Sequence, residues 1–277
     1  MCKEQDMRLT IIALLVLVQS APAAFEKMTN GGRANGMGGV IAGTSGDPWG
    51  ALDNPASLPT MADRTLAFYH TPGMMGLTEL SRTSVAFVEP FQTGGIAFSA
   101  SRFGFDLYRE VTAAISLGIA PMKDFRFGVT IHYCHLTIRD YGSAGTLKLD
   151  AGVQIAVTGE MVYAFCVSNL NAGTIGSTKE RLPQVFSTGI MYHPVPGACI
   201  GLDIVKDIAF PANLRLGVEY IMVALVALRA GVSSEPSGVS GGIGLVTSLF
   251  QLDYAISSHP DLGMSHHLSL AVNFGGL

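Results

Sequence analysis

The sequence predicts an all-β protein, a transmembrane antiparallel β-barrel of about fourteen strands. Three observations predict this fold class: apolar and polar residues alternate from about residue 65 onward, the charged residues within that alternation keep to one face, and long connections alternate with short ones. The composition agrees, since 48% of the 277 residues are hydrophobic, only 14% are charged, and the mean hydropathy is +0.38. Such a chain is not disordered, and its net charge of −4 gives no reason to expect nucleic-acid binding.

Residues 1–23 have the features of a secretory signal peptide. Arg8 precedes an apolar run, and the small-residue site Ala21-Pro22-Ala23 follows it. The run is too short to span a bilayer, so we favour a cleaved signal over a core helix. Met1 and Met7 are both candidate start residues, because acidic residues between them are unusual in the positive region that opens a signal peptide.

Alternation with a period of two residues marks the strands of the predicted barrel, residues 65–277. In the last segment Leu268, Leu270 and Val272 form one apolar face. Residues 221–224 contain no Gly, Pro, Asn or Asp to make a turn, so a helix is the alternative there. The fourteen segments are 65–69, 83–88, 94–101, 110–119, 125–138, 146–157, 161–168, 185–192, 198–205, 213–221, 224–233, 239–247, 249–257 and 266–274.

Charged residues within these segments lie on the face opposite the aliphatic and aromatic side chains, and the apolar face carries none. In a soluble sandwich the second face would be rich in Lys, Glu and Thr, whereas here it is mostly Gly, Ala and Ser. A membrane barrel requires this division, because a charge at the bilayer midplane costs about 2–4 kcal/mol and the lumen tolerates charge. We therefore favour a membrane barrel over a secreted sandwich or jelly roll. The predicted lumen-facing charges are Glu110, Arg126, Lys148, Asp150, Asp203, Arg215, Glu219, Arg229 and Asp253.

The connections between segments alternate in length, as expected for barrels with short periplasmic turns and longer external loops. An N-terminus in the periplasm would make the long set external. The long connections follow odd-numbered segments, at 70–82, 102–109, 139–145, 169–184, 206–212, 234–238 and 258–265. The short ones are 89–93, 122–124, 158–160, 193–197, 222–223 and 248.

Residues 24–64 lack the alternation and cannot form a strand of the wall. Gly, Asn, Asp and Pro are concentrated in residues 31–39 and 46–58. This is not a phosphate-binding loop, since no strand precedes it and no Gly-Lys-Ser or Gly-Lys-Thr follows. The residues that define the two stretches are Arg33, Gly36, Gly38, Gly39, Asp47, Asp53, Asn54 and Pro55.

These two stretches read G-x-R-A-x-G-M-G-G over residues 31–39, then Asp47, then N-P-A-x-L over residues 54–58. The pattern resembles the FadL-like outer-membrane transporters of hydrophobic compounds and the related PorV and PorQ barrels. Residues 254–270 are similar to the closing hairpin of the PorV-type group. Three positions depart from the pattern: Gly32 where Ala is usual, Asp53 where an aromatic residue is common, and His267 where Arg is usual.

The resemblance implies a fourteen-stranded barrel in the bacterial outer membrane, surrounded by lipid, in which residues 24–64 fold inward as a plug. Arg33, Asp47 and Asp53 would then pair with lumen charges; the alternative is that the lumen charges pair with one another and with water. The implied function is passive uptake of hydrophobic small molecules. The alternatives are a PorV-like accessory barrel, whose partners belong to a type IX secretion system, and a structural or general-diffusion barrel.

No catalytic or metal-binding constellation stands out, so we expect neither an enzyme nor a cofactor. The seven histidines lack metal-ligand spacing, and no Gly-x-Ser-x-Gly elbow is present. His132 and Cys134 share one face, but no further ligand completes a tetrahedral site, which favours a hydrogen-bonded lumen histidine. Cys134, Cys166 and Cys199 are expected to be small buried residues. A barrel hydrolase with Ser, His and Asn brought together in space is the alternative that the sequence leaves open.

Overall fold

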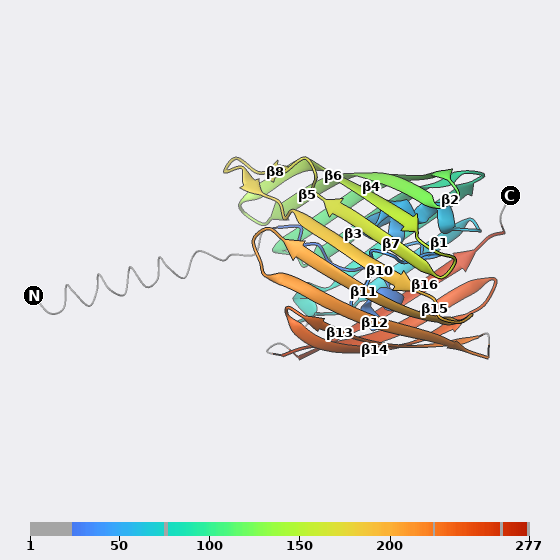
Figure 1. Cartoon of the computed structure of the whole chain (residues 1–277). Coiled ribbons are helices and arrows are strands. Elements are labelled where there is room, and N and C mark those ends of the chain that lie inside the picture. The colour runs from blue at the N-terminus through green and yellow to red at the C-terminus, as the bar shows by residue number, and fades with distance from the viewer. Residues whose placement is uncertain (1–23, 75–76, 224, 261–262, 276–277) are drawn as a thin grey trace, which may run out of the picture.

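The computed structural model describes residues 24–74, 77–223, 225–260 and 263–275, and the predicted signal peptide lies outside them. Fourteen antiparallel strands close into one barrel, in which each strand pairs with its neighbours in the chain and β1 pairs with β16 (Figure 1). The predicted all-β class and the fourteen barrel strands are confirmed. The strands are β1 (Thr65–Thr71), β2 (Arg82–Phe91), β3 (Gly94–Gly104), β4 (Tyr108–Met122), β5 (Phe125–Ile138), β6 (Gly142–Ala156), β7 (Met161–Ser168), β10 (Val185–Tyr192), β11 (Ala198–Asp207), β12 (Ala212–Met222), β13 (Val226–Ser234), β14 (Ser237–Val246), β15 (Phe250–His259) and β16 (Gly263–Asn273).

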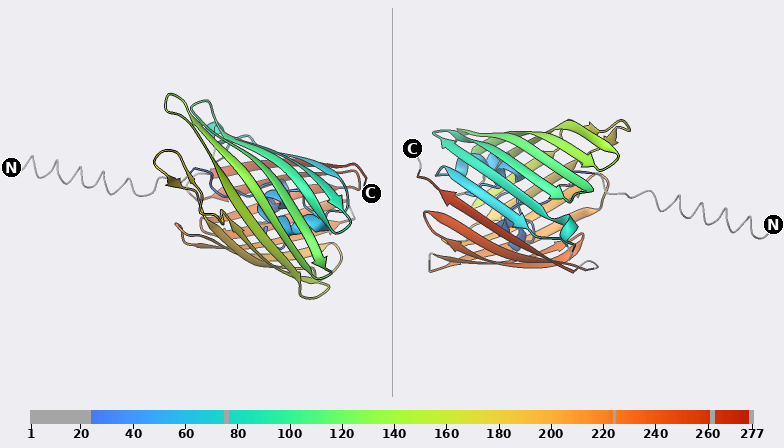
Figure 2. Two further views of the ribbon diagram at one scale, coloured as in Figure 1. Left: turned by 90° about the horizontal axis from the view of Figure 1, so that it is seen from above. Right: turned by 180° about the vertical axis from the view of Figure 1, so that it is seen from behind.

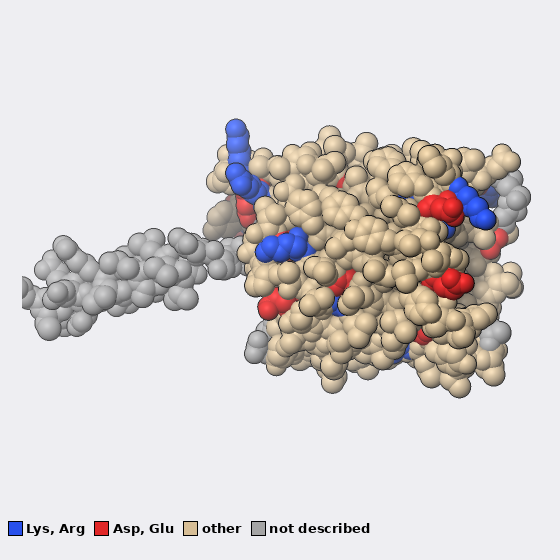
Figure 3. All heavy atoms as spheres, in the orientation of Figure 1, with Lys and Arg blue, Asp and Glu red and all other residues tan. Residues whose placement is uncertain are grey.

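The wall separates two environments, because successive side chains of a strand point to opposite faces. In β12, Leu214, Leu216 and Val218 are 51%, 44% and 41% exposed and point outward, whereas Gly217 and Glu219, which alternate with them, are buried. On the face drawn in Figure 3 most charged atoms lie toward the two ends of the barrel, and the surface between them is largely uncharged. The outward face therefore presents an apolar band, as a lipid-facing wall requires.

The strands are longer than the alternation predicted, and this corrects the predicted asymmetry of the connections. Five of the connections expected to be long shrink to 105–107, 139–141, 208–211, 235–236 and 260–262. Only 72–81 and 169–184 remain long, and the second contains an unpredicted two-stranded sheet, β8 (Thr174–Ile175) with β9 (Glu180–Arg181). The backbone ladders simply continue through residues such as Arg102 and Tyr108, which pair with their neighbours although they break the pattern of apolar residues.

The predicted division between two strands near residues 222–223 is confirmed, because β12 continues to Met222, which pairs with Val226 of β13, and the alternative of a helix does not hold for the described residues there. One further expectation was wrong for the same reason as the connections. The outward face is not free of charge, because the strand extensions place charged side chains near the two rims. These are Glu89, Arg102, Arg109 and Lys206.

The N-terminal segment, residues 24–64, runs through the interior of the barrel. It contains the short helices α2 (Gly32–Gly36), α3 (Gly50–Asp53) and η2 (Pro55–Thr60), which lie between opposite walls in both views of Figure 2. Among the described residues, no helix is long and apolar enough to cross a membrane. Helix α2 contacts β13 to β16, and η2 contacts β2 to β6, so the segment touches both sides of the wall.

The N-terminal segment begins at the mouth that carries the long connection 169–184 and ends at the opposite rim. Ala24 and Phe25 pack with Ile175 and Leu182 of the long connection 169–184, at the mouth near β8 and β9. The segment ends at the opposite rim, where Arg64 pairs with Glu89. It therefore traverses the barrel before β1 begins.

Candidate functional site: the barrel interior

Glycines on the inner wall let the backbone of the N-terminal segment approach the strands. A Cβ atom built on Gly128 would lie 2.3 Å from the carbonyl carbon of Pro55, and one on Gly231 would lie 2.2 Å from the amide nitrogen of Gly38. Both distances are far below van der Waals contact, so only glycine fits. The wall glycines that face the segment in this way also include Gly95, Gly118, Gly152, Gly201, Gly217 and Gly242.

The Asn-Pro-Ala stretch begins helix η2 and contacts the wall. The side chain of Asn54 caps the helix, since its Oδ1 accepts a hydrogen bond from Ala56 N at 3.2 Å, and Pro55 occupies the first turn, where no amide hydrogen is needed. Asn54 Nδ2 donates to Ala42 O at 2.7 Å, which ties the two halves of the segment together. Gln154 of β6 donates to the same carbonyl at 3.1 Å and to Thr44 O at 2.9 Å.

A buried ion network joins helix α2 to strands β12, β13 and β15. Glu219 lies between two guanidinium groups: Arg33 Nη2 donates to Glu219 Oε1 at 2.8 Å, and Arg229 Nε donates to Glu219 Oε2 at 2.5 Å. Arg229 Nη1 also donates to Asp253 Oδ1 at 2.7 Å. Since buried charges are stable only when paired, removing one member leaves an uncompensated charge inside the barrel.

Asp203 and Arg215, which face each other on β11 and β12, hold the backbone of residues 39–42. Asp203 Oδ2 accepts from the amides of Ile41 and Ala42 at 2.7 and 2.9 Å. Arg215 Nη1 donates to Gly39 O at 2.7 Å. These two charges therefore bind peptide groups of the segment rather than its charged side chains.

A second charged cluster lies on the other side of the interior. Asp150 accepts from His132 Nε2 at 3.1 Å, and the ammonium groups of Lys148 and Lys27 lie 3.5 and 3.9 Å from its Oδ2. Lys27 also lies 3.9 Å from Asp53 Oδ1, within the segment itself. The lysine from the segment thus bridges a wall carboxylate and a segment carboxylate.

The remaining predicted residues lie in different surroundings. Glu110 Oε1 accepts from Phe25 N at 3.0 Å, whereas Arg126 Nη1 reaches only Gln154 Oε1, at 3.2 Å, and no part of the segment. Asp47 does not pair with a lumen charge as expected; its Oδ1 accepts from Trp49 N at 3.0 Å. Burial raises the pKa of Asp47 to about 6, although the nearby Arg33 acts in the opposite direction.

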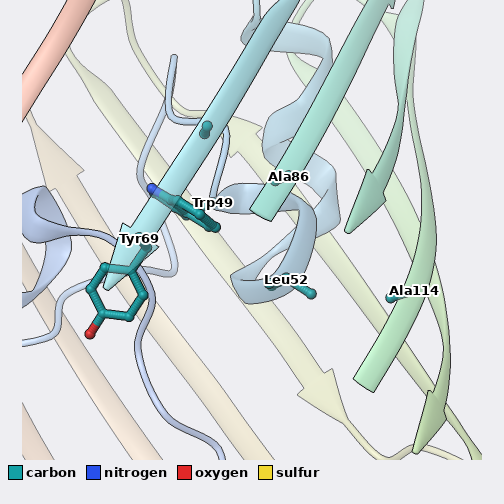
Figure 4. Packing of buried hydrophobic residues seen from close by; sticks show 6 residues of the cluster. Trp49, Leu52, Tyr69, Ala86 and Ala114 are labelled. Atoms are coloured by element: carbon teal, nitrogen blue, oxygen red, sulfur yellow. The ribbon is translucent and has the colours of Figure 1, made fainter. Parts of the chain in front are cut away.

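Several interior residues were missed from the sequence. Lys27 and Arg82 line the lumen but lie outside the motifs and the recognised strand segments. Figure 4 shows a buried apolar cluster in which Trp49 and Leu52 of the segment meet Tyr69 of β1 and Ala114 of β4. The rings of Trp49 and Tyr69 are 5.8 Å apart at 64°. Trp49 is the one tryptophan of the chain, and this was the feature of the sequence that could have marked it as an interior residue.

The structure places Ser257 Oγ 2.9 Å from His267 Nε2, which bears on the hydrolase alternative. The other ring nitrogen, Nδ1, meets the hydroxyl groups of Tyr69 and Thr71 at 2.9 and 3.2 Å. No carboxylate or amide orients this imidazole among the residues described, so the arrangement is a hydrogen-bonded network and not a hydrolase triad. Nor do the described His, Cys, Asp and Glu side chains form a group that could hold a metal ion.

Two adjacent cavities between the segment and the wall are the larger ones there among the described residues. The first, about 420 Å³, opens at the mouth beside the apolar side chains of Val185, Val205 and Phe210. The second, about 220 Å³, is lined by hydroxyl and amide groups such as those of Ser240 and Ser257. The two cavities share Asn213, Arg215, Pro236 and His259 in their walls.

Beside the inner cavity the wall contains a seam between β14 and β15. Backbone pairing ends at Ser240 and Ser257, although β14 begins at Ser237 and β15 continues to His259. Ser258 Oγ accepts from Val239 N at 3.0 Å and donates to Val239 O at 3.2 Å. A serine side chain thus replaces the backbone ladder at this point.

Comparison with known proteins supports the fold. No family model and no curated protein matches the chain. The P. putida toluene transporter TodX is similar over 90% of this chain and 99% of its own, with a TM-score of 0.70 and 13% identity. The CymD monoaromatic hydrocarbon channel is similar over 91% of this chain and 99% of its own, with a TM-score of 0.69 and 12% identity. A Pseudomonas aeruginosa FadL homologue is similar over 91% of this chain and 100% of its own, with a TM-score of 0.65 and 13% identity.

These likenesses define the class of protein: a closed fourteen-stranded barrel with the fold of FadL-type hydrophobic-compound channels. At identities of 12–13% they establish the fold alone. The named neighbours are channels and transporters rather than enzymes. The PorV part of the sequence resemblance gains no support from them.

Proposed function

We propose that this chain is a bacterial outer-membrane channel for the passive uptake of small hydrophobic molecules. The observation that carries the proposal is the fold shared, over nine tenths of the chain, with proteins named as a toluene transporter and a monoaromatic hydrocarbon channel. Monoaromatic hydrocarbons are therefore the first substrate class to test. The predicted signal peptide and the apolar outer band are consistent with export and insertion into the outer membrane.

In this proposal the mouth cavity receives the ligand. Val185, Val205 and Phe210 give it an apolar wall, and 420 Å³ falls within the range of small-molecule sites. The mouth cavity is also lined by the charged residues Glu26, Lys27, Asp207, Arg215 and Glu235. A small apolar compound would therefore leave water mainly by contact with Val185, Val205 and Phe210.

The N-terminal segment acts as the plug that prevents straight passage. An apolar ligand moving further down the lumen would have to desolvate the network of Arg33, Glu219, Arg229 and Asp253, which is unfavourable. The seam between β14 and β15 offers a sideways exit toward lipid instead, because fewer backbone hydrogen bonds close the wall there. We therefore place the exit of the ligand at Val239 and Ser258.

Whole-cell uptake tests the proposal against a general-diffusion barrel. Cells expressing the full chain should take up labelled toluene faster than cells with an empty vector, while permeation of the polar compound nitrocefin stays unchanged. Phe210→Glu should lower the toluene uptake, since it places a charge on the apolar wall of the mouth. Tyr141→Glu is the matched control, because Tyr141 is 90% exposed and lies outside that cavity. Equal gains for toluene and nitrocefin would favour general diffusion.

A further inference from the structure

Three arginines project outward from neighbouring strands at one rim of the barrel. Arg102 lies near the end of β3, Arg109 is the second residue of β4, and Arg139 directly follows β5, and all three are exposed. Arg102 pairs with Val111, two residues from Arg109, and Arg109 pairs with Thr137, two residues from Arg139. Diagonal neighbours of this kind lie roughly 7–8 Å apart, so the three guanidinium groups form a short oblique row.

The row lies directly beyond the apolar band of the same strands. Moving toward the rim on the outward face, Phe98, Ile115 and Ile131 occupy one level, and Tyr133 occupies the next. Tyr133 is 51% exposed and stacks on His135, which shares a level with Arg102. Hydrophobic, aromatic and then cationic side chains succeed one another, which is the order expected where a wall passes from hydrocarbon through the interface to the headgroups.

None of the three guanidinium groups is paired within the part of the chain that the structure describes. The arginines in ion pairs there are Arg33, Arg64 and Arg229. Of the acidic residues near the row in sequence, Asp106 and Asp140 lie in the adjoining turns and Glu110 points to the inner face, and none of them forms an ion pair with the row. Three fork-shaped donors are therefore available to an external acceptor.

The row is confined to one sector of the rim. On the other side of the same rim, the ammonium group of Lys206 of β11 is occupied by the carbonyl oxygen of Phe210, and Lys179 and Arg181 are exposed in the connection 169–184. The outward ends of β13, β14 and β16 carry Ser234, Ser237 and Met264. The other cations at this rim do not form such a row, so the particular feature of this sector is the diagonal adjacency of three arginines.

We propose that Arg102, Arg109 and Arg139 form a binding surface for the phosphate groups of membrane-lipid headgroups in the leaflet at this rim. Guanidinium groups bind phosphate through two parallel N–H···O hydrogen bonds, which an ammonium group cannot reproduce. The three guanidinium groups are separated by two diagonal distances between neighbouring strands. This spacing suits one headgroup that carries more than one phosphate, or the phosphates of two adjacent lipids. The surface requires the barrel to sit in lipid, and it does not depend on transport.

Lipid titration of the full chain in detergent, read by native mass spectrometry, tests this surface. The probes are dioleoylphosphatidic acid, dioleoylphosphatidylcholine and inorganic phosphate. Phosphatidic acid should bind at least about tenfold more tightly than phosphatidylcholine, and the triple variant Arg102→Gln, Arg109→Gln, Arg139→Gln should lose at least about tenfold of that affinity. The control triple Lys123→Gln, Lys179→Gln, Arg181→Gln removes the same charge from exposed positions elsewhere and should keep it.

Equal loss in both triple variants would overturn the proposal, because it would show an attraction to net charge only. Binding of inorganic phosphate as tight as that of the lipid would overturn it too, by indicating a free-anion site. If the triple variant fails to fold, Arg109→Lys replaces it: this variant keeps the charge but not the paired donors, and should weaken phosphatidic acid binding while remaining heat-modifiable. Unchanged binding by Arg109→Lys would contradict recognition by the guanidinium fork.

Discussion

At the scale of single residues, glycines on the inner wall determine how close the N-terminal segment comes to the strands. The side chains on the inner face can be so small because the segment supplies the atoms that fill the lumen. Gly128 shows the constraint most clearly, since its α-carbon faces the backbone of Pro55, which cannot swing aside as a flexible side chain would. Trp49, 3% exposed and unique in the chain, reports whether the segment is in place.

Gly128→Ala should displace the segment without opening the wall. The added methyl group would overlap Pro55, and such overpacking costs about 1–3 kcal/mol. Quenching of Trp49 fluorescence by acrylamide should therefore increase, while heat-modifiable migration of the barrel is retained. Gly241→Ala is the control, because its nearest neighbour would be Arg229 O at 3.8 Å. If both variants shield Trp49 as the wild type does, the close approach at Gly128 is contradicted.

Asp47 predicts a pH dependence of the same fluorescence signal. Its folded-state pKa of about 6 lies above the ordinary value of 3.8, so the docked segment favours the protonated form. Docking should therefore weaken as the pH rises from about 4 to about 6, by about 3 kcal/mol at most. Acrylamide should quench Trp49 more at about pH 7.5 than at about pH 4.5. Asp47→Asn keeps an acceptor for Trp49 N and should remove this difference; a difference that persists in the variant would assign it to another group.

The sequence allowed some of these residue contacts to be predicted and not others. Arg33 was expected to meet a lumen charge, and it meets Glu219, because opposite charges enclosed in one lumen must find partners. The partners of Asp47 could not be predicted, since a turn amide competes with distant cations and only the folded backbone decides between them. Lys27 was missed because nothing in its neighbours marks it as pointing inward.

At the scale of the elements, alternation determined which face each strand residue occupies but not where each strand ends. Side-chain period follows from the pleat, and so the register of β12 could be predicted from Leu214 to Val218. Strand ends depend instead on whether the neighbouring backbone continues to offer hydrogen bonds. That information is not local, which explains the overestimated loops and the unpredicted β8 and β9.

The facing of β12 gives a prediction at this scale. Leu216→Arg should impair assembly, because a cation on the lipid face near the midplane costs about 2–4 kcal/mol. Arg215→Leu should still yield a heat-modifiable barrel, since Arg215 contacts the segment through Gly39 O and not the wall ladder. Outer-membrane fractions analysed with and without heating compare the two. Equal tolerance would show that the register is displaced by one residue.

A disulfide across the seam tests the proposed exit. In Val239→Cys, Ser258→Cys the oxidised form should take up toluene more slowly than the reduced form, because the covalent link prevents β14 and β15 from separating. The control pair, Leu228→Cys with Ile243→Cys, joins β13 and β14 within a continuous ladder and should be insensitive to oxidation. If the oxidised seam variant transports as fast as its reduced form, the ligand leaves elsewhere.

At the scale of the whole molecule, the low charge and high glycine content have one explanation. Lipid-facing positions must be apolar, and inner positions must be small where the segment packs, so charge is left to the interior networks and the rims. A barrel of fourteen strands is too wide for its own side chains to fill, whereas eight-stranded barrels can be filled in this way. The N-terminal segment occupies the space that would otherwise hold water.

Single-channel conductance in planar bilayers tests the central claim, that residues 24–64 close a barrel which would otherwise be an open pore. The deletion of residues 24–64 should still form a barrel, because the hydrogen bonds of the wall run between strands and do not involve the segment. The wild type should be nearly closed, and the deletion should show large, stable open levels. Wild type and deletion with indistinguishable conductance, both in heat-modifiable form, would contradict the account.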